Sequence, residues 1–335
     1  MTDNTIWDKE IPVPAEVISY VDPAILKALP PGTKTSGISP SGSSYWARTA
    51  KIEAAGPNGE EKNYFMKVHQ GDTGKDMVSA FFQGMSSLHD AAPDLVAKPI
   101  SWGSYTSIAD THFFLCEFHN LSGAIPEKEI FTVRVAEMHK TTRLKSETFG
   151  FPYPAYGGNQ KQVFPVTKTW EECFSKGLQG LFERETETNG YDEENERFKK
   201  AMIEKVIPRL LRPLETGDRK IIPVLVHGDL WDGNASVNEE TGRPVIFDAT
   251  PVWAHNEYEL GPWFCPRHKF NEYISDYTNH FPISDPKEEF EDRGALYSLR
   301  FDMLSSSLYP GNLKFRYLAM ETMRKLVKRY GDGVE

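Results

Sequence analysis

Cysteine, long apolar runs and an excess of basic charge are the features that this sequence has little of. Its 335 residues include only three cysteines: Cys116, Cys173 and Cys265. They are too few and too widely spaced for a disulfide framework or a zinc cage. No apolar run approaches the roughly 18 residues of a membrane span, and the start, Met1–Glu10, lacks the basic and then apolar pattern of a secretory signal. These absences predict a reduced, cytoplasmic protein with no membrane partner.

The charge balance excludes a further class of partner. Acidic residues number 48 and basic residues 38, so the formal net charge is −10. Bulk contact with phosphate backbones needs a basic surface, so a general nucleic-acid binder is not expected. A content of 39% apolar residues is ample for a core. A prior of roughly 150 residues per domain suggests two domains or lobes.

The residue pattern, and with it the predicted secondary structure, changes along the chain. Residues 1–30 read as a tail and a short helix, with Asp22 as the N-cap and Pro23 at the first helical position. Residues 31–119 combine strand-like runs with one helix, predicted from the apolar spacing of Met77, Phe81, Met85 and Leu88. Asp72 or Thr73 is expected to cap that helix. Residues 120–335 are mostly helical, with helices expected near 129–143, 169–188, 193–212, 287–308 and 312–330, and Pro208 is expected to kink or end the third.

The most informative segment is His227–Asn234, His-Gly-Asp-Leu-Trp-Asp-Gly-Asn, which comes directly after an apolar strand. Protein kinases carry His-Arg-Asp-Leu-x-x-x-Asn in the catalytic loop and Asp-Phe-Gly after the next strand. Asp229 and Asn234 have this spacing, and Gly228 replaces the arginine. Asp248 ends a second apolar strand, where a metal-binding carboxylate is expected. The alternative, a hairpin whose Asp and Asn side chains serve only turn geometry, explains single residues but not the whole set.

This set of residues suits phosphoryl transfer. A carboxylate must receive and orient the attacking hydroxyl, and we assign this catalytic role to Asp229. Mg²⁺ bridges nucleotide phosphates and takes few protein oxygens, because it keeps water and phosphate ligands. Asn234 and Asp248 offer a neutral and an anionic oxygen for such an ion.

A kinase-like arrangement also needs a lysine from a strand of the other lobe. Lys67 fits because it is a charge inside an otherwise apolar strand, although an edge-strand lysine that faces water is the alternative. Upstream, residues 37–44 are expected to cover the phosphates with backbone N–H groups and small side chains, with Gly37, Ser41 and Gly42 as the candidates. An ordinary turn is the alternative, since this is not a Gly-x-Gly-x-x-Gly loop.

The chain resembles the fructosamine-3-kinase (ketosamine-3-kinase) family, a branch of the protein-kinase-like and aminoglycoside-phosphotransferase fold. The matching motifs are His227–Asn234, Phe247–Thr250, His255–Gly261, Lys98–Gly103, Glu137–His139 and Phe149–Asn159. The resemblance implies an α+β, bilobal fold with a β-rich N-lobe and a larger α-rich C-lobe. It also implies ATP-dependent phosphorylation of the sugar 3-hydroxyl of a ketosamine, a ribulosamine or fructosamine on a protein lysine or small amine. The phosphorylated adduct of this family is unstable, so the reaction leads to deglycation.

Roles carry over with the motifs. Asp229 would be the base, Asn234 and Asp248 the metal ligands, and Lys67 the phosphate-binding lysine. The resemblance places Glu117 and Phe118 at the hinge that offers backbone groups to adenine. Trp231, His255 and Glu257 are candidates to line the sugar pocket, because an indole face packs on a sugar ring and carboxylates accept from hydroxyls. Ordinary packing or helix capping is the alternative for these three.

The chain departs from the family pattern at two places. The helix glutamate that should pair with Lys67 is absent, and its position falls at or near Phe81. The final metal segment reads Asp-Ala-Thr at residues 248–250, where the family has Asp-Pro-Ala. Two other functions stay open, the first because it shares the catalytic residues and the second because the helix carboxylate is missing. One is a phosphotransferase on another hydroxylated amine, such as an aminoglycoside, and the other is a nucleotide-binding pseudokinase.

Overall fold

The computed structural model describes residues 12–42 and 44–331. Ser43, within the segment expected to cover the phosphates, lies outside the described residues, as does Met1–Glu10. The chain divides into two compact units, which are described one at a time. The first unit is Met1–Ala124 with Val237–Asp248, and the second is Ile125–Ser236 with Ala249–Glu335.

The first unit is built on a five-stranded antiparallel sheet with the strand order β1-β2-β3-β5-β4. Its elements are α1 (Pro23–Ala28), α2 (Gly71–Ala91), β1 (Lys34–Pro40), β2 (Arg48–Ala55), β3 (Tyr64–Gln70), β4 (Pro99–Ser104), β5 (Thr111–Glu117) and β10 (Pro244–Ile246). The segment that contains β10 joins this unit through a parallel bridge between Val96 and Ile246. The side chain of Asp22 accepts the Ala24 N–H, so the predicted cap of α1 is confirmed.

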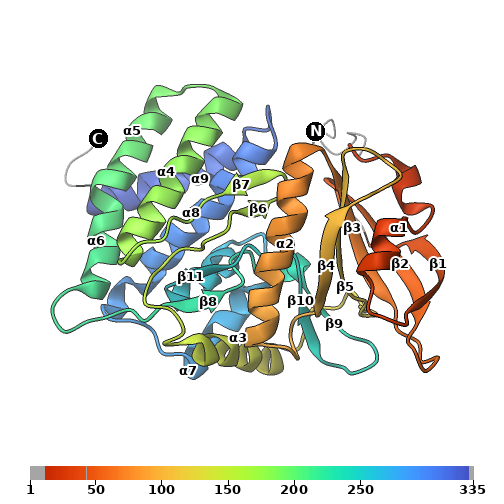
Figure 1. The fold of residues 1–335 in the computed structure, drawn as a ribbon. Helices are drawn as coiled ribbons and strands as arrows, with labels where there is room; N and C mark the ends of the chain where they lie inside the picture. Colours follow the sequence, from red (N-terminus) through yellow and green to blue (C-terminus); the bar gives the residue numbers. More distant parts are fainter. Residues whose placement is uncertain (1–11, 43, 332–335) are drawn as a thin grey trace. The chain divides into compact units, whose positions relative to one another are not determined.

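The two faces of this sheet are chemically different. Because side chains alternate along a strand, Tyr64, Met66 and Val68 point to one face of β3, and Lys67 and His69 point to the other. The first set joins a buried core with Ile25 of α1. The second set faces α2, where the His69 and Phe81 rings lie 5.7 Å apart. Figure 1 shows α1 and α2 on opposite sides of the sheet. Lys67 is therefore held between a strand and a helix.

The start of α2 differs from the prediction. The helix begins at Gly71, and its N-cap, Gln70, makes no side-chain capping hydrogen bond, so neither Asp72 nor Thr73 is the cap. β3 runs directly into the helix, and the chain turns there at Gly71 with φ of 78°. Glycine adopts this conformation without the steric cost that a Cβ brings. Backbone geometry, rather than a capping side chain, sets this boundary.

The second unit is mainly helical. Its elements are α3 (Lys128–Thr142), α4 (Trp170–Asn189), α5 (Glu193–Ala201), α6 (Ile207–Leu211), α7 (Ile274–His280), α8 (Phe290–Leu308), α9 (Lys314–Tyr330), β6 (Ala155–Gly157), β7 (Gln160–Gln162), β8 (Val224–Val226) and β11 (Val252–Ala254). Strand β9 (Ala235–Val237) begins in this unit and ends in the first. The helices α4, α8 and α9 pack around one core, and β8 pairs antiparallel with β11 beneath it. Among the described residues, no helix has both the length and the apolarity to cross a bilayer.

Pro208 does not end the helical segment that contains it. A π-helical segment, Met202–Val206, joins α5 to α6, and helical structure continues through Pro208. Proline lacks the N–H that an α-helix needs at this point. The wider π turn directly before it changes the hydrogen-bond pattern, so the chain passes the proline without ending the helix.

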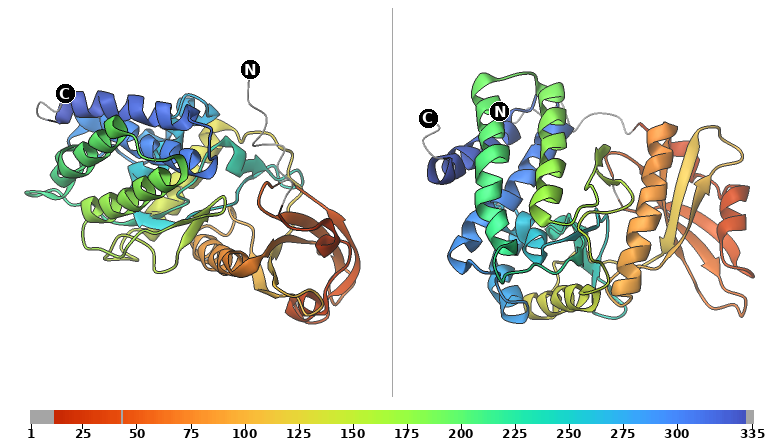
Figure 2. Two further views of the ribbon diagram at one scale, coloured as in Figure 1. Left: turned by 90° about the horizontal axis from the view of Figure 1, so that it is seen from above. Right: turned by 60° about the vertical axis from the view of Figure 1, so that its left-hand side comes forward.

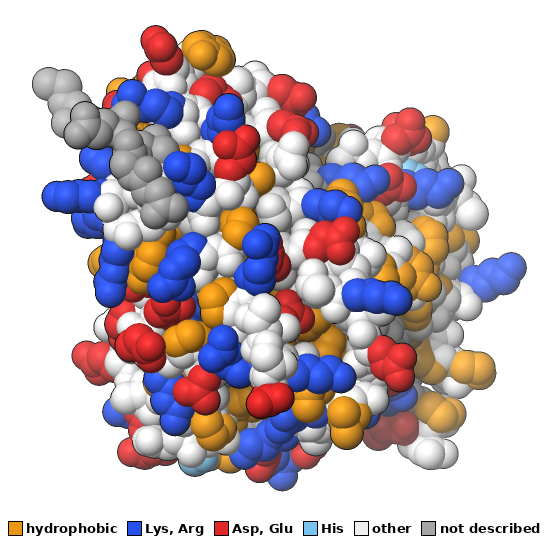
Figure 3. All heavy atoms as spheres, turned by 90° about the vertical axis from the view of Figure 1, so that its left-hand side faces the viewer, with side chains coloured by type: hydrophobic (Ala, Val, Ile, Leu, Met, Phe, Trp, Pro, Cys, Tyr) orange, Lys and Arg blue, Asp and Glu red, His pale blue; other side chains and the backbone are white. Residues whose placement is uncertain are grey.

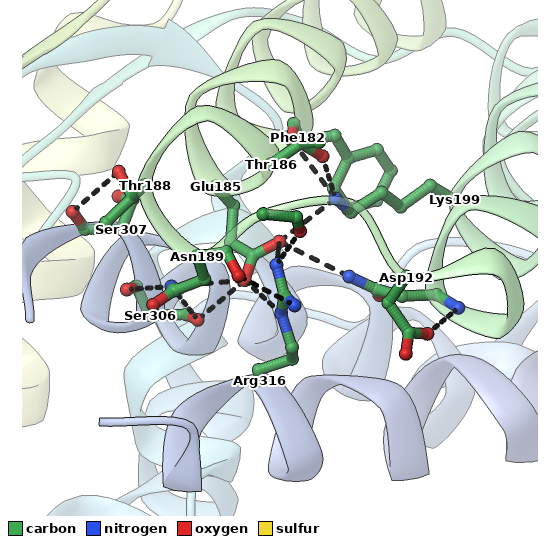
Figure 4. Close-up of polar contacts among 12 residues, drawn as sticks. Phe182, Glu185, Thr186, Thr188, Asn189, Asp192, Lys199, Ser306, Ser307 and Arg316 are labelled. Carbon is green, nitrogen blue, oxygen red and sulfur yellow. Dashed lines mark hydrogen bonds and ion pairs between the residues drawn. The ribbon is translucent and has the colours of Figure 1, made fainter. Parts of the chain in front are cut away.

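One buried carboxylate ties four helices of the second unit together (Figure 4). Glu185 of α4 is fully buried and accepts from Arg316 of α9 at 2.6 and 3.1 Å. Lys199 of α5 donates to it at 3.0 Å, and Ser306 of α8 donates at 2.9 Å. Burial alone would raise the pKa of Glu185, but the hydrogen bonds from Arg316 and Lys199 outweigh it and lower the pKa. The charge of Glu185 therefore compensates two buried cations.

We expect Glu185→Ala to reduce the free energy of unfolding by about 3–5 kcal/mol, because Arg316 and Lys199 would stay buried without their counter-charge. Urea denaturation monitored by circular dichroism measures this loss. The matched control is Glu172→Ala, which breaks an exposed pair with Lys176 on the same helix. Exposed charges of both signs are interspersed on the face shown in Figure 3, and single pairs of this kind contribute little. Equal losses in the two variants would contradict the assigned role of Glu185.

Candidate active site

The loop after β8 in the second unit carries the predicted catalytic residues. His227 leaves the strand, and its carbonyl accepts the Thr250 N–H at 2.9 Å. Gly228 has φ of 80°, and a Cβ at this position would lie 2.1 Å from the carbonyl oxygen of Thr250. No other residue fits there without displacing that segment. The glycine that replaces the arginine of protein kinases is thus a steric requirement of this loop.

Glu259 anchors the start of the loop. Its carboxylate accepts the N–H groups of His227 at 2.6 Å and Gly228 at 3.0 Å. The Nε2 atom of His139, on α3, lies 3.2 Å from the same carboxylate, and both side chains are fully buried. Burial would raise the pKa of Glu259, but hydrogen bonds from His139 and from the His227 backbone outweigh it and lower the pKa. An ionised, immobile acceptor therefore fixes the backbone directly before Asp229.

Asp229 and Asn234 lie together at the end of this loop. The Nδ2 atom of Asn234 donates to the Asp229 carbonyl at 2.9 Å and to its Oδ2 atom at 3.2 Å. The short helical turn Asp232–Asn234 brings the amide back towards the carboxylate. Asp229 is half-buried and Asn234 is buried. Since the amide nitrogen serves Asp229, the Oδ1 atom of Asn234 is the one suited to a cation.

Trp231 lies between these two residues in sequence and is half-buried. Its ring packs over Gly233, where an added Cβ would meet the indole at 2.1 Å, and stands 5.1 Å from the ring of His268. Asp232 accepts the Lys269 N–H at 3.1 Å. The indole face that was predicted to meet a sugar thus packs against its own loop and retains some exposure.

Lys67 and Asp248 meet within the first unit. The Nζ atom of Lys67 lies 2.7 Å from the Oδ1 atom of Asp248. Lys67 is only 8% exposed, whereas the side chain of Asp248 is 52% exposed. Asp248 has φ of 57°, a region that non-glycine residues adopt infrequently and that is often found at functional sites. Lys67 is therefore not a water-facing lysine, and a carboxylate from the predicted metal segment is its ionic partner.

The glycine and serine candidates lie at the turn between β1 and β2. Gly37 is within β1 at an irregularity in register, and a Cβ there would lie 2.8 Å from the carboxylate of Glu53. The Ser41 N–H donates to the Thr49 carbonyl at 3.1 Å, and Gly42 has φ of 78°. The segment is a hairpin turn in the first unit, and its contact with phosphates stays a prediction.

The hinge candidates show which backbone groups are available. The Glu117 N–H donates to the Lys98 carbonyl at 2.9 Å, and the Phe118 N–H donates to the Asn63 carbonyl at 3.1 Å. Both N–H groups are thus committed within the first unit. A contact of either residue with adenine, if made in this conformation, would use a carbonyl oxygen.

His255 and Glu257 are buried in the second unit, and their partners favour packing over sugar recognition. His255 lies 2.9 Å from the Tyr297 hydroxyl and 2.9 Å from the Ser284 hydroxyl. Glu257 is 2% exposed and receives two hydrogen bonds from Arg293, at 2.7 and 3.0 Å. Every polar atom of both side chains is engaged within the fold. Their contact with a sugar stays a prediction.

Sequence reasoning missed the role of Glu259. It lies in the same segment as His255 and Glu257, and the motif could not separate one acid from the other. The distinguishing signal is its partners, two backbone N–H groups about 30 residues earlier in the chain. A sequence pattern cannot display contacts of this kind.

Comparisons with known proteins show the family and the fold of this chain. The chain is 29% identical to the chloroplastic protein-ribulosamine 3-kinase of Oryza sativa subsp. japonica over 243 residues, 72% of this chain. That match covers 66% of the rice protein, just under two thirds of its length. A solved structure from Thermobifida fusca, assigned as a fructosamine-3-kinase, aligns with a TM-score of 0.71 at 19% identity, over 89% of this chain and 95% of that one.

A more distant structure is that of an aminoglycoside phosphotransferase, APH(4)-Ia, in a ternary complex with AMP-PNP and hygromycin B. It aligns with a TM-score of 0.56 at 15% identity, over 90% of this chain and 96% of that one. The chain thus has the protein-kinase-like fold, and the predicted fold class is confirmed. The fructosamine kinase family model matches residues 47–329. The chain belongs to the fructosamine kinase family, as its motifs predicted.

We expect Glu259→Gln to lower kcat for phosphoryl transfer by about 100-fold, because a shift of about 1 Å in catalytic groups has that cost. Glutamine has one acceptor oxygen where Glu259 uses two against the loop. The KM for ATP should change little. Steady-state kinetics below the melting temperature measure both. The control Glu289→Gln also removes a buried carboxylate, one that pairs with Arg209, and should keep kcat. Unchanged kcat in Glu259→Gln would contradict the anchoring role.

Buried His255 makes stability depend on pH. Burial lowers its pKa to about 4 in the folded state, whereas an unfolded histidine titrates near its ordinary value of about 6.5. Between these values the unfolded chain binds more protons, so the free energy of unfolding falls as the pH falls through this window, by up to about 1.4 kcal/mol per pH unit. His255→Gln should give a flatter profile by urea denaturation at pH 4–7. Parallel profiles for the two proteins would contradict this.

Proposed function

We propose that this protein is an ATP-dependent kinase that phosphorylates the sugar 3-hydroxyl of ketosamines, with deglycation as the consequence. Membership of the fructosamine kinase family and the similarity to the rice protein-ribulosamine 3-kinase support the reaction class. The observation that carries the proposal is the pair of hydrogen bonds from Asn234 to Asp229, in a loop that Glu259 anchors. The acceptors proposed are ribulosamines and fructosamines on protein lysines or small amines.

Asp229 would act as the general base. It accepts the proton of the sugar hydroxyl as that oxygen forms a bond to the γ-phosphorus of ATP. The bond from this phosphorus to the bridging oxygen breaks, and ADP leaves with the electron pair. Asn234 keeps the carboxylate oriented through its amide nitrogen. Lys67 would bind the α- and β-phosphates with its ammonium group, as the corresponding lysine does in protein kinases.

The donor chemistry of the chain fits Mg²⁺. Among the described residues, no group of three His, Cys, Asp or Glu side chains forms a metal site. Mg²⁺ with a nucleotide needs only one or two protein oxygens, because phosphates and water supply the rest. The Oδ1 atom of Asn234 and the carboxylate of Asp248 are each proposed as an oxygen ligand of the kind that Mg²⁺ takes, and the ion would neutralise charge on the phosphates. We also propose a cytoplasmic location, where ATP is available.

We expect Asp229→Asn to reduce kcat at least 100-fold, the lower end of the usual contribution of a general base. Purified protein is incubated with Mg-ATP and a panel of ribulosamine, fructosamine and aminoglycoside acceptors, and the product is located by ³¹P NMR and mass spectrometry. Asp232→Asn is the matched control, because Asp232 lies in the same loop and bonds Lys269 instead. It should stay within a few-fold of the wild type.

The panel separates the alternatives. Phosphate on the 3-hydroxyl of a ketosamine supports the proposal. Transfer only to aminoglycosides would replace the proposed substrate class while keeping the mechanism. Thermal stabilisation by ATP without transfer to any acceptor would identify a pseudokinase and overturn the proposed activity.

A further inference from the structure

The surroundings of Lys67 differ from those of the lysine in a protein kinase. In those enzymes the strand lysine pairs with a glutamate of the adjacent helix, and this pair must be in place for activity. Here the Nζ atom of Lys67 lies 2.7 Å from Asp248 and 4.7 Å from the centroid of the Phe81 ring. Both Lys67 and Phe81 are only 8% exposed. An aromatic face thus occupies the side of the ammonium that faces the helix.

Helix α2 has no acid that could take the place of the glutamate. Its three aspartates, Asp72, Asp76 and Asp90, are all exposed near its ends. Phe81 lies one turn from Met77 and one turn from Met85, and all three are buried on the face that packs against the sheet. The ring therefore stands on the face of the helix from which a carboxylate would reach a strand lysine.

The ring itself is held in place. The ring of His69, two residues beyond Lys67 on the same face of β3, lies 5.7 Å from Phe81, and the ring of Phe114 lies 6.4 Å away in an edge orientation. His69 is 3% exposed, and burial together with the charge of Lys67 lowers its pKa to about 3. It is thus neutral and does not add a second cation beside the ring. Phe81 is a fixed surface for the ammonium.

We propose that Phe81 is the positioning residue for Lys67 and holds the ammonium against its ring face by a cation–π interaction, in place of the helix carboxylate. A ring attracts the cation through its quadrupole and carries no charge of its own. Phe81 therefore positions the ammonium group of Lys67, and α2 supplies no negative charge that would neutralise it. Its full charge remains for Asp248 or for nucleotide phosphates. The inference rests on the proposed phosphate-binding role of Lys67.

The experiment replaces Phe81 in the full-length protein with mono-, di- and trifluorinated phenylalanine. Each fluorine withdraws electron density from the ring face and changes its size little, so a packing role and a cation–π role separate. We expect kcat/KM for ATP to fall stepwise, by about tenfold over the series. A value that stays constant across the series would overturn the proposal.

Fluorination of Phe113 is the matched control. Phe113, on β5 of the sheet, is also buried but belongs to the core on the face opposite to Lys67. Its series should leave kcat/KM unchanged. Two ordinary variants extend the test, since Phe81→Tyr keeps a ring and should retain activity, while Phe81→Leu should lose about tenfold. A Leu variant as active as the Tyr variant would count against the proposal.

A readout without nucleotide tests the geometry directly. In ¹³C-labelled protein the ε-methylene protons of Lys67 should be shifted upfield by the ring current of Phe81, and Phe81→Leu should remove the shift. Lys67→Met separates this inference from the proposed function. If Lys67→Met leaves the KM for ATP and kcat unchanged, the phosphate-binding role fails. If it lowers kcat/KM while fluorination has no effect and the upfield shift is absent, only the role of Phe81 fails.

Discussion

The position of the loop that carries Asp229 depends on one buried carboxylate, Glu259, which accepts hydrogen bonds from two successive backbone N–H groups, those of His227 and Gly228. Strand β8 is only three residues long, so its ladder with β11 cannot by itself fix the position of the loop beyond it. A charge-assisted hydrogen bond to a backbone N–H is stronger and shorter than a neutral one. His139 keeps the acceptor ionised, and Gly228 permits the close approach to Thr250. These contacts set the position of Asp229.

The first unit places its key residue by different means. Lys67 is presented by a strand whose other face belongs to the core, so alternation alone aims it at α2. There it meets an aromatic ring and, on another side, the carboxylate of Asp248. The family pattern puts a carboxylate on the helix, and its absence from the sequence is matched by a buried ring rather than by an empty space. The missing carboxylate of the family motif thus corresponds to the ring of Phe81 in the structure.

The sequence allowed some of these features to be predicted and concealed others. Long helices such as α2, α4 and α9 were predicted because their apolar spacing is a local signal. The predicted N-cap residue of α2 was wrong, because a positive φ at Gly71 sets the start of that helix. His255 and Glu257 were chosen as substrate residues from their motif, but their partners Tyr297 and Arg293 come from α8, about 40 residues later. Contacts between distant segments decide whether a polar residue is buried or lines a site, and no spacing reports them.

Amide hydrogen exchange at His227 and Gly228 tests the central claim most directly. If the Glu259 carboxylate holds both N–H groups in a fully buried site, the two amides should exchange only through large-scale opening, as slowly as the core amides of α8. This can be read by NMR in the protein without nucleotide. Exchange of either amide at the rate of an exposed loop would contradict the claim, because the loop would then lack the anchor that sets the position of Asp229.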